Sequence, residues 1–218
     1  MRPSASCHQP SASFTIFPVT VDSGYEGPQS SLNNFDDFCS IAGIEGYSFT
    51  NKIDAANIIK NQLTKPGFRI LSTGQRLLQQ DVLELDCVYQ DISGNFFQYT
   101  EGKDTTIVCF NNSLPYGIEL QRVMKKSNLC SSLFSVNSHL HVDYSYIIDN
   151  IKNTKKLILI DDTKSRNRLS DRFLVDVLSA STLKNKIIIS RTITNKSFYP
   201  CKDELDIDYN KIINDITL

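Results

Sequence analysis

The sequence predicts an α/β protein with a largely parallel sheet, and residues 155–191 give the clearest basis for that prediction. Two short segments there, Leu157–Ile160 and Ile187–Ile189, are apolar at every position. Strands that are buried on both faces, as in a parallel sheet covered by helices, have this pattern. Between these segments, apolar residues recur at helical spacing from Leu169 to Leu178. We therefore expect a strand, a helix and a parallel strand joined by a right-handed crossover.

Residues 161–170 follow the first of these strands as a polar loop and are the first candidate for a functional site. In open α/β sheets, ligands bind outside the carboxyl ends of the strands, where this loop would lie. Charged side chains in and beside the loop could bind an anionic group, although a solvated loop with exchanging surface ion pairs is the favoured alternative. The charged residues are Asp161, Asp162, Lys164, Arg166, Arg168, Asp171 and Arg172.

Length and composition predict a globular protein that buries a core. A chain of 218 residues has room for one large domain or two small ones. The formal net charge of −1 gives no reason to expect a nucleic-acid or membrane partner. The sequence has no long apolar run, its N-terminus lacks the apolar stretch of a secretory signal, and its 6 cysteines form no C-x-x-C pair. These features favour a cytoplasmic protein.

The first part of the chain, residues 13–78, alternates strands and helices. Residues 14–21 alternate as a strand, in which Pro18 would suit an edge or a bulge. Residues 1–12 are rich in Ser and Pro, and we expect them to be disordered. The elements expected next are the start of a helix within 31–38, a strand at 46–50, a helix at 53–63 and a strand at 68–71.

A hairpin is predicted between the two α/β parts. Residues 79–101 alternate apolar and polar side chains and contain the turn signal Ser93-Gly94-Asn95, so we expect a β-hairpin linker with a domain boundary near Glu101-Gly102. The second part, residues 102–218, should then form its own α/β domain. Besides the crossover unit, its expected elements are a strand at 106–110, a helix at 114–124, a strand at 133–136, a helix at 144–151 and a last helix at 209–216.

His139 and His141 are the only pair of histidines close in sequence. Alternate strand residues share a face, so two imidazoles could meet one metal ion. No further metal-ligating residue lies at suitable spacing, so a surface pair at a strand end is the favoured alternative. The sequence has no phosphate-binding glycine loop and no G-x-S-x-G nucleophile motif. These residues by themselves therefore do not reveal a reaction.

Several stretches, in unbroken order over residues 14–218, carry a resemblance to a known family. They are Gly24–Ser31 (GYEGPQSS), Gly43–Gly46 (GIEG) with Asp54–Lys60 (DAANIIK), Gly102–Val108 (GKDTTIV), Ser135–Asp143 (SVNSHLHVD) and Leu159–Asp162 (LIDD). They resemble G-x-x-G-P-x-H-S, I-P-G-L with D-A-K-G-L-L-K, G-x-D-V-T-L-V, D-L-R-T-L-x-P-L-D and V-V-x-E in the beta subunit of thiamine-diphosphate-dependent 2-oxo acid dehydrogenases. The same stretches resemble transketolase less closely. The resemblance implies a partial pyrimidine-binding-like segment at 13–78 and a transketolase C-terminal-like domain at 102–218.

Four departures from the family pattern bear on function. The family histidine that handles substrate protons falls on Ser30, and serine has no titration near neutrality. The glycine loop falls on residues 166–169, where side chains prevent a close backbone approach. The family arginine falls on Asn137. Lys65 lies near the position of an aspartate that helps to hold a monovalent cation, and its ammonium would repel such an ion or take its place.

The resemblance also sets what the chain can do alone. The upstream half of the pyrimidine-binding domain, with the glutamate that activates the cofactor, and the diphosphate-binding domain, with its metal motif, have no counterpart here. Thiamine diphosphate with Mg is therefore expected only if partner chains complete the site. We expect no catalytic residue, cofactor ligand or metal ligand in this chain alone. The candidate interface residues are Tyr25, Gln29, Ser30, Asp161, Arg166 and Arg168.

Three hypotheses follow from the resemblance. In the first, the chain is a truncated beta-subunit-like component of a split thiamine-diphosphate-dependent 2-oxo acid dehydrogenase or transketolase-type enzyme. Its partners would be alpha-type and pyrimidine-domain-completing subunits, in a hetero-oligomer or dimer. In the second, it is a non-catalytic pseudoenzyme that serves as a scaffold or regulatory subunit. In the third, it is a fragment of a longer protein.

Overall fold

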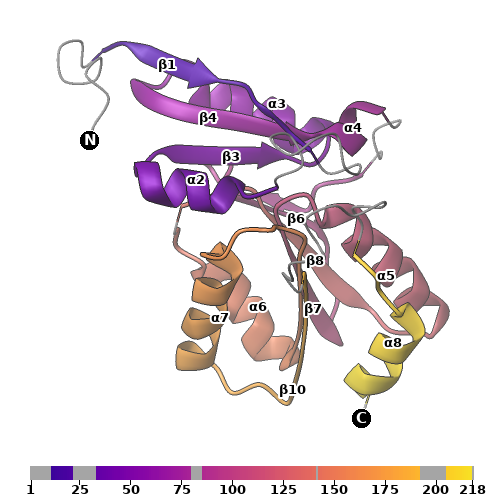
Figure 1. Cartoon of the computed structure of the whole chain (residues 1–218). Coiled ribbons are helices and arrows are strands. Elements are labelled where there is room, and N and C mark those ends of the chain that lie inside the picture. Colours follow the sequence, from indigo (N-terminus) through magenta and orange to yellow (C-terminus); the bar gives the residue numbers. More distant parts are fainter. Residues whose placement is uncertain (1–10, 22–32, 80–84, 141, 192–204, 218) are drawn as a thin grey trace.

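A computed structural model describes residues 11–21, 33–79, 85–140, 142–191 and 205–217. In these residues, a small sheet near the N-terminus lies above a larger six-stranded sheet (Figure 1). Both sheets are largely parallel and carry helices, so the predicted α/β fold class is confirmed. None of the helices in the described part has the length and apolar character that a transmembrane segment needs.

The small sheet is parallel throughout, with one strand at its centre. Its strands are β1 (Ser13–Ile16), β2 (Val19–Thr20), β3 (Glu45–Phe49) and β4 (Gly67–Gly74). Strands β1 and β2 pair with one side of β4, and β3 pairs with the other. Helix α2 (Phe35–Ala42) packs on one face against Ile70, and α3 (Lys52–Gln62) packs on the other face against Leu71. The short helix α4 (Gln75–Gln79) follows β4.

The strand predicted at 14–21 is interrupted once. Its two parts keep one register against β4, because Ile16 lies opposite Ile70 and Val19 lies opposite Thr73. The interruption falls at Pro18, which has no N–H to donate to the ladder. The helices predicted nearby are also present, and α3 begins with a capping box between Asn51 and Asp54.

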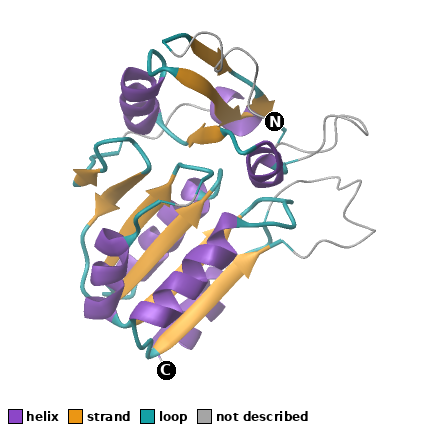
Figure 2. Ribbon diagram, turned by 90° about the vertical axis from the view of Figure 1, so that its left-hand side faces the viewer, coloured by secondary structure: helices purple, strands orange, loops and turns teal. Residues whose placement is uncertain are grey.

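The larger sheet has helices on both faces (Figure 2). Its strand order is β10-β9-β7-β8-β6-β5, and the first four of these are parallel. Helices α5 and α8 cover one face, and α6 and α7 cover the other. The bounds are β5 (Tyr89–Gln90), β6 (Phe96–Thr100), β7 (Thr105–Phe110), α5 (Leu114–Lys126), β8 (Ser131–Val136), α6 (Ser145–Thr154), β9 (Lys156–Asp161), α7 (Leu169–Ala180), β10 (Asn185–Ser190) and α8 (Tyr209–Thr217).

The predicted crossover unit is confirmed as β9, α7 and β10. One detail differs from the prediction. Strand β10 lies at the edge of the sheet, and its central residue Ile188 is 45% exposed, so this strand is not buried on both faces. The predicted hairpin is present as β5 and β6, and β6 pairs antiparallel with β8. The hairpin is therefore built into the larger sheet, while the domain limits placed around it stay a prediction.

The two sheets are joined along β3. The chain that leaves β8 turns back beneath this strand and pairs with it in an antiparallel bridge between Tyr47 and Ser138. The Ser48 N–H donates to the Asn137 carbonyl at 2.8 Å, and the His139 N–H donates to the Gly46 carbonyl at 2.8 Å. This connection brings α2 over the carboxyl ends of the larger sheet's strands.

Candidate functional site

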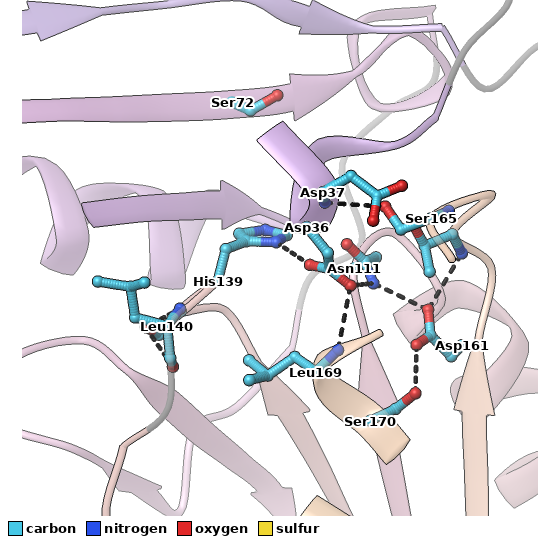
Figure 3. Close-up of polar contacts among 12 residues, drawn as sticks. Asp36, Asp37, Ser72, Asn111, His139, Leu140, Asp161, Ser165, Leu169 and Ser170 are labelled. Atoms are coloured by element: carbon cyan, nitrogen blue, oxygen red, sulfur yellow. Dashed lines mark hydrogen bonds and ion pairs between the residues drawn. The ribbon is translucent and has the colours of Figure 1, made fainter. Parts of the chain in front are cut away.

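The larger sheet has a topological switch point between β7 and β9. These neighbouring parallel strands lead into α5 and α7, which lie on opposite faces of the sheet. Such a point leaves a crevice outside the carboxyl ends of the strands, and ligands of open α/β proteins bind there. Asn111 directly follows β7, and Asp161 is the last residue of β9. Here, the crevice is occupied by the first turn of α2 (Figure 3).

Asn111 links the two carboxylates in this crevice. Its Nδ2 donates to Asp161 Oδ1 at 2.8 Å and to Asp36 Oδ2 at 3.3 Å. All three side chains are buried. The amide therefore bridges α2 of the small sheet to two strand ends of the larger one. The sequence did not indicate Asp36 or Asn111, because each lies in a short polar stretch without a recognisable motif.

His139 completes this group from the chain that follows β8. Its Nδ1 lies 2.5 Å from Asp36 Oδ1, and the Phe35 ring packs edge-on against the imidazole with centroids 4.3 Å apart. The residue is only 5% exposed, so the predicted surface position is wrong for His139. The reason is tertiary, because the chain turns beneath β3 at this point. Among the described residues, no group of His, Cys, Asp or Glu side chains could hold a metal ion.

Asp161 is fully buried and accepts hydrogen bonds from three directions. Ser170 Oγ donates at 2.5 Å, the Thr163 N–H at 3.0 Å, and Asn111 donates as described above. Burial raises the pKa of Asp161 to about 6, and the charge of Asp36 adds to the rise, while the three hydrogen bonds oppose it. The expectation of a solvated loop is therefore wrong at this residue.

Asp162 is also fully buried, and its environment differs from that of Asp161. An Arg76 guanidinium nitrogen lies 3.2 Å from Asp162 Oδ2, and the Asn112 N–H donates to Oδ1 at 3.1 Å. Arg76 is itself held by the Tyr116 hydroxyl at 2.7 Å. This carboxylate thus ties α4 to the strand ends of the larger sheet.

The loop that follows β9 wraps the start of α2. The Asp37 carboxylate accepts from the Arg166 N–H at 3.0 Å and from the Asn167 N–H at 2.9 Å. The Asp37 N–H donates to Ser165 Oγ at 3.2 Å, and the Asn167 amide donates to Ser40 Oγ at 2.8 Å. Residues 166–169, which the sequence resemblance matches to the family's glycine loop, therefore make contacts within this chain.

Of the predicted interface residues in this loop, two have side chains near the surface. Arg166 is exposed, and Arg168 Nε lies 3.1 Å from Asp171 Oδ2 in a surface ion pair. Asp161 lies inside the chain. A role of these residues in an interface stays a prediction.

The other residues singled out in the sequence lie away from this crevice or outside the described part. Lys65 Nζ lies 3.4 Å from Glu45 Oε1, and both side chains are well exposed. Four of the residues fall outside the described ranges: Tyr25, Gln29, Ser30 and His141.

A second buried carboxylate, Asp54, lies where β3, α3 and the larger sheet meet. It accepts from the Thr50 N–H at 3.0 Å, from Asn137 Nδ2 at 2.9 Å and from the Tyr99 hydroxyl at 3.3 Å. Burial raises the pKa of Asp54, and hydrogen bonds from Thr50, Asn51 and Asn137 counteract part of the rise. Asn137, on which the family arginine falls, thus serves as a link between the sheets. The sequence did not indicate this cluster, because only the contacts of Asp54 with Thr50 and Asn51 join near neighbours in the chain.

The chemistry of the crevice does not fit a bound diphosphate. It contains four carboxylates. Arg76 compensates the charge of Asp162, and the carboxylates of Asp36, Asp37 and Asp161 would repel an anionic group. The pairing of His139 Nδ1 with Asp36 leaves Nε2 without a hydrogen-bond partner among the described residues, an arrangement that can orient an imidazole as a base. The burial of both side chains keeps a substrate away from it. The hydrogen bonds among Asp36, Asn111, His139 and Asp161 therefore join α2 to the larger sheet. We call this group the seam.

Comparison with known proteins gives a match at the level of the fold. No family model and no curated protein matches the sequence. A split-gene transketolase, solved as an inactive beta4 tetramer, superposes with a TM-score of 0.67 and 12% identity over 93% of this chain and 65% of that chain. The chain has a transketolase-like fold.

Other transketolases give the same result over a smaller share of their length. The Campylobacter jejuni enzyme matches with a TM-score of 0.58 and 10% identity over 92% of this chain and 29% of that chain. A Pichia stipitis transketolase mutant matches with a TM-score of 0.56 and 11% identity over 93% and 28%. The present chain thus spans less than two thirds of the length of each of these three proteins.

Proposed function

We propose that this chain is a component of a split, transketolase-type enzyme and acts in the cytoplasm only with partner chains that supply the thiamine diphosphate and Mg site. The observation that carries the proposal is the filled crevice at the switch point of the larger sheet. The chain's own α2 stands where an open α/β protein would bind a ligand, and its carboxylates Asp36 and Asp37 lie near those of Asp161 and Asp162 at the strand ends. A cofactor site would therefore have to be formed with other chains.

The fold comparison supports this proposal. The split-gene transketolase is named as an inactive tetramer of beta chains. By analogy, this chain assembles with other chains, and it is inactive without partners of a different type. Alpha-type and pyrimidine-domain-completing subunits are the partners that the family resemblance favours.

The proposal is tested by co-expression. The chain is purified alone and with each transketolase-type subunit encoded by its own host, and the mass of each product is measured by size-exclusion chromatography with light scattering. Ketol transfer and 2-oxo acid decarboxylation are then assayed with thiamine diphosphate and Mg. We expect a stable heteromeric complex and activity only in that complex. A chain that remains monomeric with every candidate subunit would overturn the proposal.

A second candidate function is a non-catalytic pseudoenzyme that serves as a scaffold or regulator. The observation that favours it is the serine at position 30, which replaces the family's proton-handling histidine. Introducing Ser30→His into the assembled complex separates the two functions. An unchanged decarboxylation rate fits the scaffold, whereas a large gain in rate argues for a catalytic framework in which this position lies close to the substrate.

A further inference from the structure

We propose that the outer edge of β1 and β2 binds a β-strand of a partner subunit, and that this strand is uncharged, apolar and followed by an amphipathic helix. The inference rests on the proposed function, since it states which kind of partner completes the small sheet. Among the described residues, β1 and β2 pair only with β4. Strand β1 lies at the top of Figure 1, where the side that does not pair with β4 faces away from the larger sheet.

The hydrogen bonds to β4 show which backbone groups point outward. The Gly67 N–H donates to the Ala12 carbonyl at 2.9 Å, and the Thr73 N–H donates to the Pro18 carbonyl at 3.4 Å. In a parallel ladder of constant register, alternate residues point their backbone groups to the same neighbour. Even-numbered residues of this edge therefore face β4, and odd-numbered residues from Ser13 to Val19 face outward.

This direction changes the meaning of Pro18. A proline in a sheet normally lies with its missing N–H toward solvent, where it weakens pairing with another strand. Here the missing N–H points toward β4, and the loss falls on the inner ladder. The outward N–H groups of Ser13, Thr15, Phe17 and Val19 are all retained. The outer edge is therefore a continuous template for a further strand.

The side chains of the edge indicate a strand that is covered on both faces. Phe14 and Ile16 are 54% and 41% exposed on the α2 side of the sheet, and Phe17 and Val19 are 54% and 47% exposed on the α3 side. No charged residue occurs between positions 11 and 21. Exposed edge strands usually carry charges that prevent pairing, whereas strands apolar on both faces occur inside parallel sheets. An uncharged apolar strand is the complementary occupant.

The partner strand should be followed by a helix. On the α2 side, the Phe14 ring stacks on Phe68 with centroids 5.2 Å apart. Helix α2 covers Ile70 further along the sheet, but leaves the side chains of Phe14 and Ile16 largely exposed. In parallel sheets, the helix of each crossover covers this kind of surface. An amphipathic helix from the partner would bury these rings.

A second copy of the chain is a poorer occupant of this edge. A two-fold axis perpendicular to the sheet would pair two copies of β1 in antiparallel fashion and place the same face of both sheets on one side. The exposed patch around Phe14 would then be doubled instead of covered. The structure thus favours a different chain.

The test uses the full chain with the transketolase-type subunits of its host and two edge variants with matched controls. Thr15→Pro removes an outward N–H without touching the ladder to β4, and Thr15→Ala retains that N–H. Phe17→Lys places a charge at the edge, and Val175→Lys places the same charge on an exposed apolar position of α7. Circular dichroism verifies that each variant is folded, and association is measured by titration calorimetry.

We expect Thr15→Pro and Phe17→Lys to weaken association by roughly tenfold or more, and both controls to bind within about twofold of the parent chain. If a complex forms and all four variants bind alike, the edge is not the docking site, while the proposed function stands. If no candidate subunit binds the parent chain, both proposals fail. If the chain alone is a dimer that Thr15→Pro dissociates, the occupant is a second copy and the inference is overturned. Phe17→Lys decides the outcome if Thr15→Pro does not fold.

Discussion

Asp161 is a carboxylate in a site that opposes its charge. It is fully buried, and its pKa is raised to about 6, first by burial and then by the charge of Asp36. A folded-state pKa above the unfolded value means that the folded chain binds the proton more tightly. The resulting stabilisation is complete below the unfolded pKa and is lost as pH rises through about 6. Asp161 therefore makes the seam less stable at neutral pH than in mild acid.

We expect Asp161→Asn to flatten this pH dependence. The amide can accept from Thr163 and Asn111 and donate to the Ser170 hydroxyl, so the hydrogen bonds are retained while the charge is removed. The free energy of unfolding, measured by urea denaturation between about pH 5 and about pH 8, should fall less steeply with rising pH than in the parent chain.

Asp171→Asn is the control for this prediction, because that side chain is 55% exposed. It should leave the pH dependence unchanged. An equally steep fall in Asp161→Asn would show that Asp161 is ionised without cost in the folded chain.

At the scale of single residues, the sequence indicated Asp161 as a candidate but did not indicate which residues surround this side chain. A charged loop after a buried strand is a local pattern, and it placed attention on the correct strand end. The partners of the seam are not local: Asp36 lies 103 positions from His139 and 75 from Asn111. No spacing rule connects residues so far apart, so their burial and pairing required the structure.

At the scale of elements, Gly46 sets the distance between α2 and β3. A Cβ atom at this position would lie 2.3 Å from Cys39 Sγ and 3.1 Å from Phe35 Cζ. Both of these side chains are on the buried face of α2. The absence of a side chain on β3 therefore lets α2 approach closely enough for Asp36 to reach His139 and Asn111.

We expect Gly46→Ala to destabilise the chain by about 1–3 kcal/mol, because the added methyl group overpacks this contact. Cys39→Ala should restore most of the loss in the double variant, since it removes the atom nearest to the new methyl group. Thermal and urea unfolding of both single variants and of the double variant measure the coupling. Additive effects in the double variant would contradict the close approach.

Element prediction succeeded where each element carried its own signal. A continuous apolar run predicts strand β9, and apolar residues at helical spacing predict helix α7. Both elements are present. The edge position of β10 could not be predicted, because an apolar run does not reveal how many neighbours a strand has. The same limit applies to the hairpin of β5 and β6, whose pairing with β8 depends on tertiary contacts.

At the scale of the whole molecule, Asn137 links the two sheets. It is fully buried, and its Nδ2 donates to the Ser48 carbonyl at 2.8 Å and to Asp54 Oδ2 at 2.9 Å. Removal of this amide would leave a buried carbonyl and a buried carboxylate each short of one donor. Such losses are costly, since neither acceptor can recover a bond to water.

We expect Asn137→Ala to lower the free energy of unfolding by about 2–4 kcal/mol, with a lower urea midpoint for the entire chain. Asn210→Ala, at an exposed position of α8, is the matched control and should change stability little. A normal midpoint in Asn137→Ala would show that the two sheets hold together without this amide.

Pro18 has a further consequence, for the solubility of the chain. Prolines beside apolar strands commonly act as gatekeepers that keep newly made protein from aggregating. Because the missing N–H of Pro18 points toward β4, this proline does not guard the open edge. When the chain is expressed by itself, we therefore expect a part of it to aggregate through the segment from Ser13 to Thr20, while the rest stays soluble. Phe17→Lys should raise the soluble fraction of the chain, measured after centrifugation of the lysate, even where no partner subunit is present.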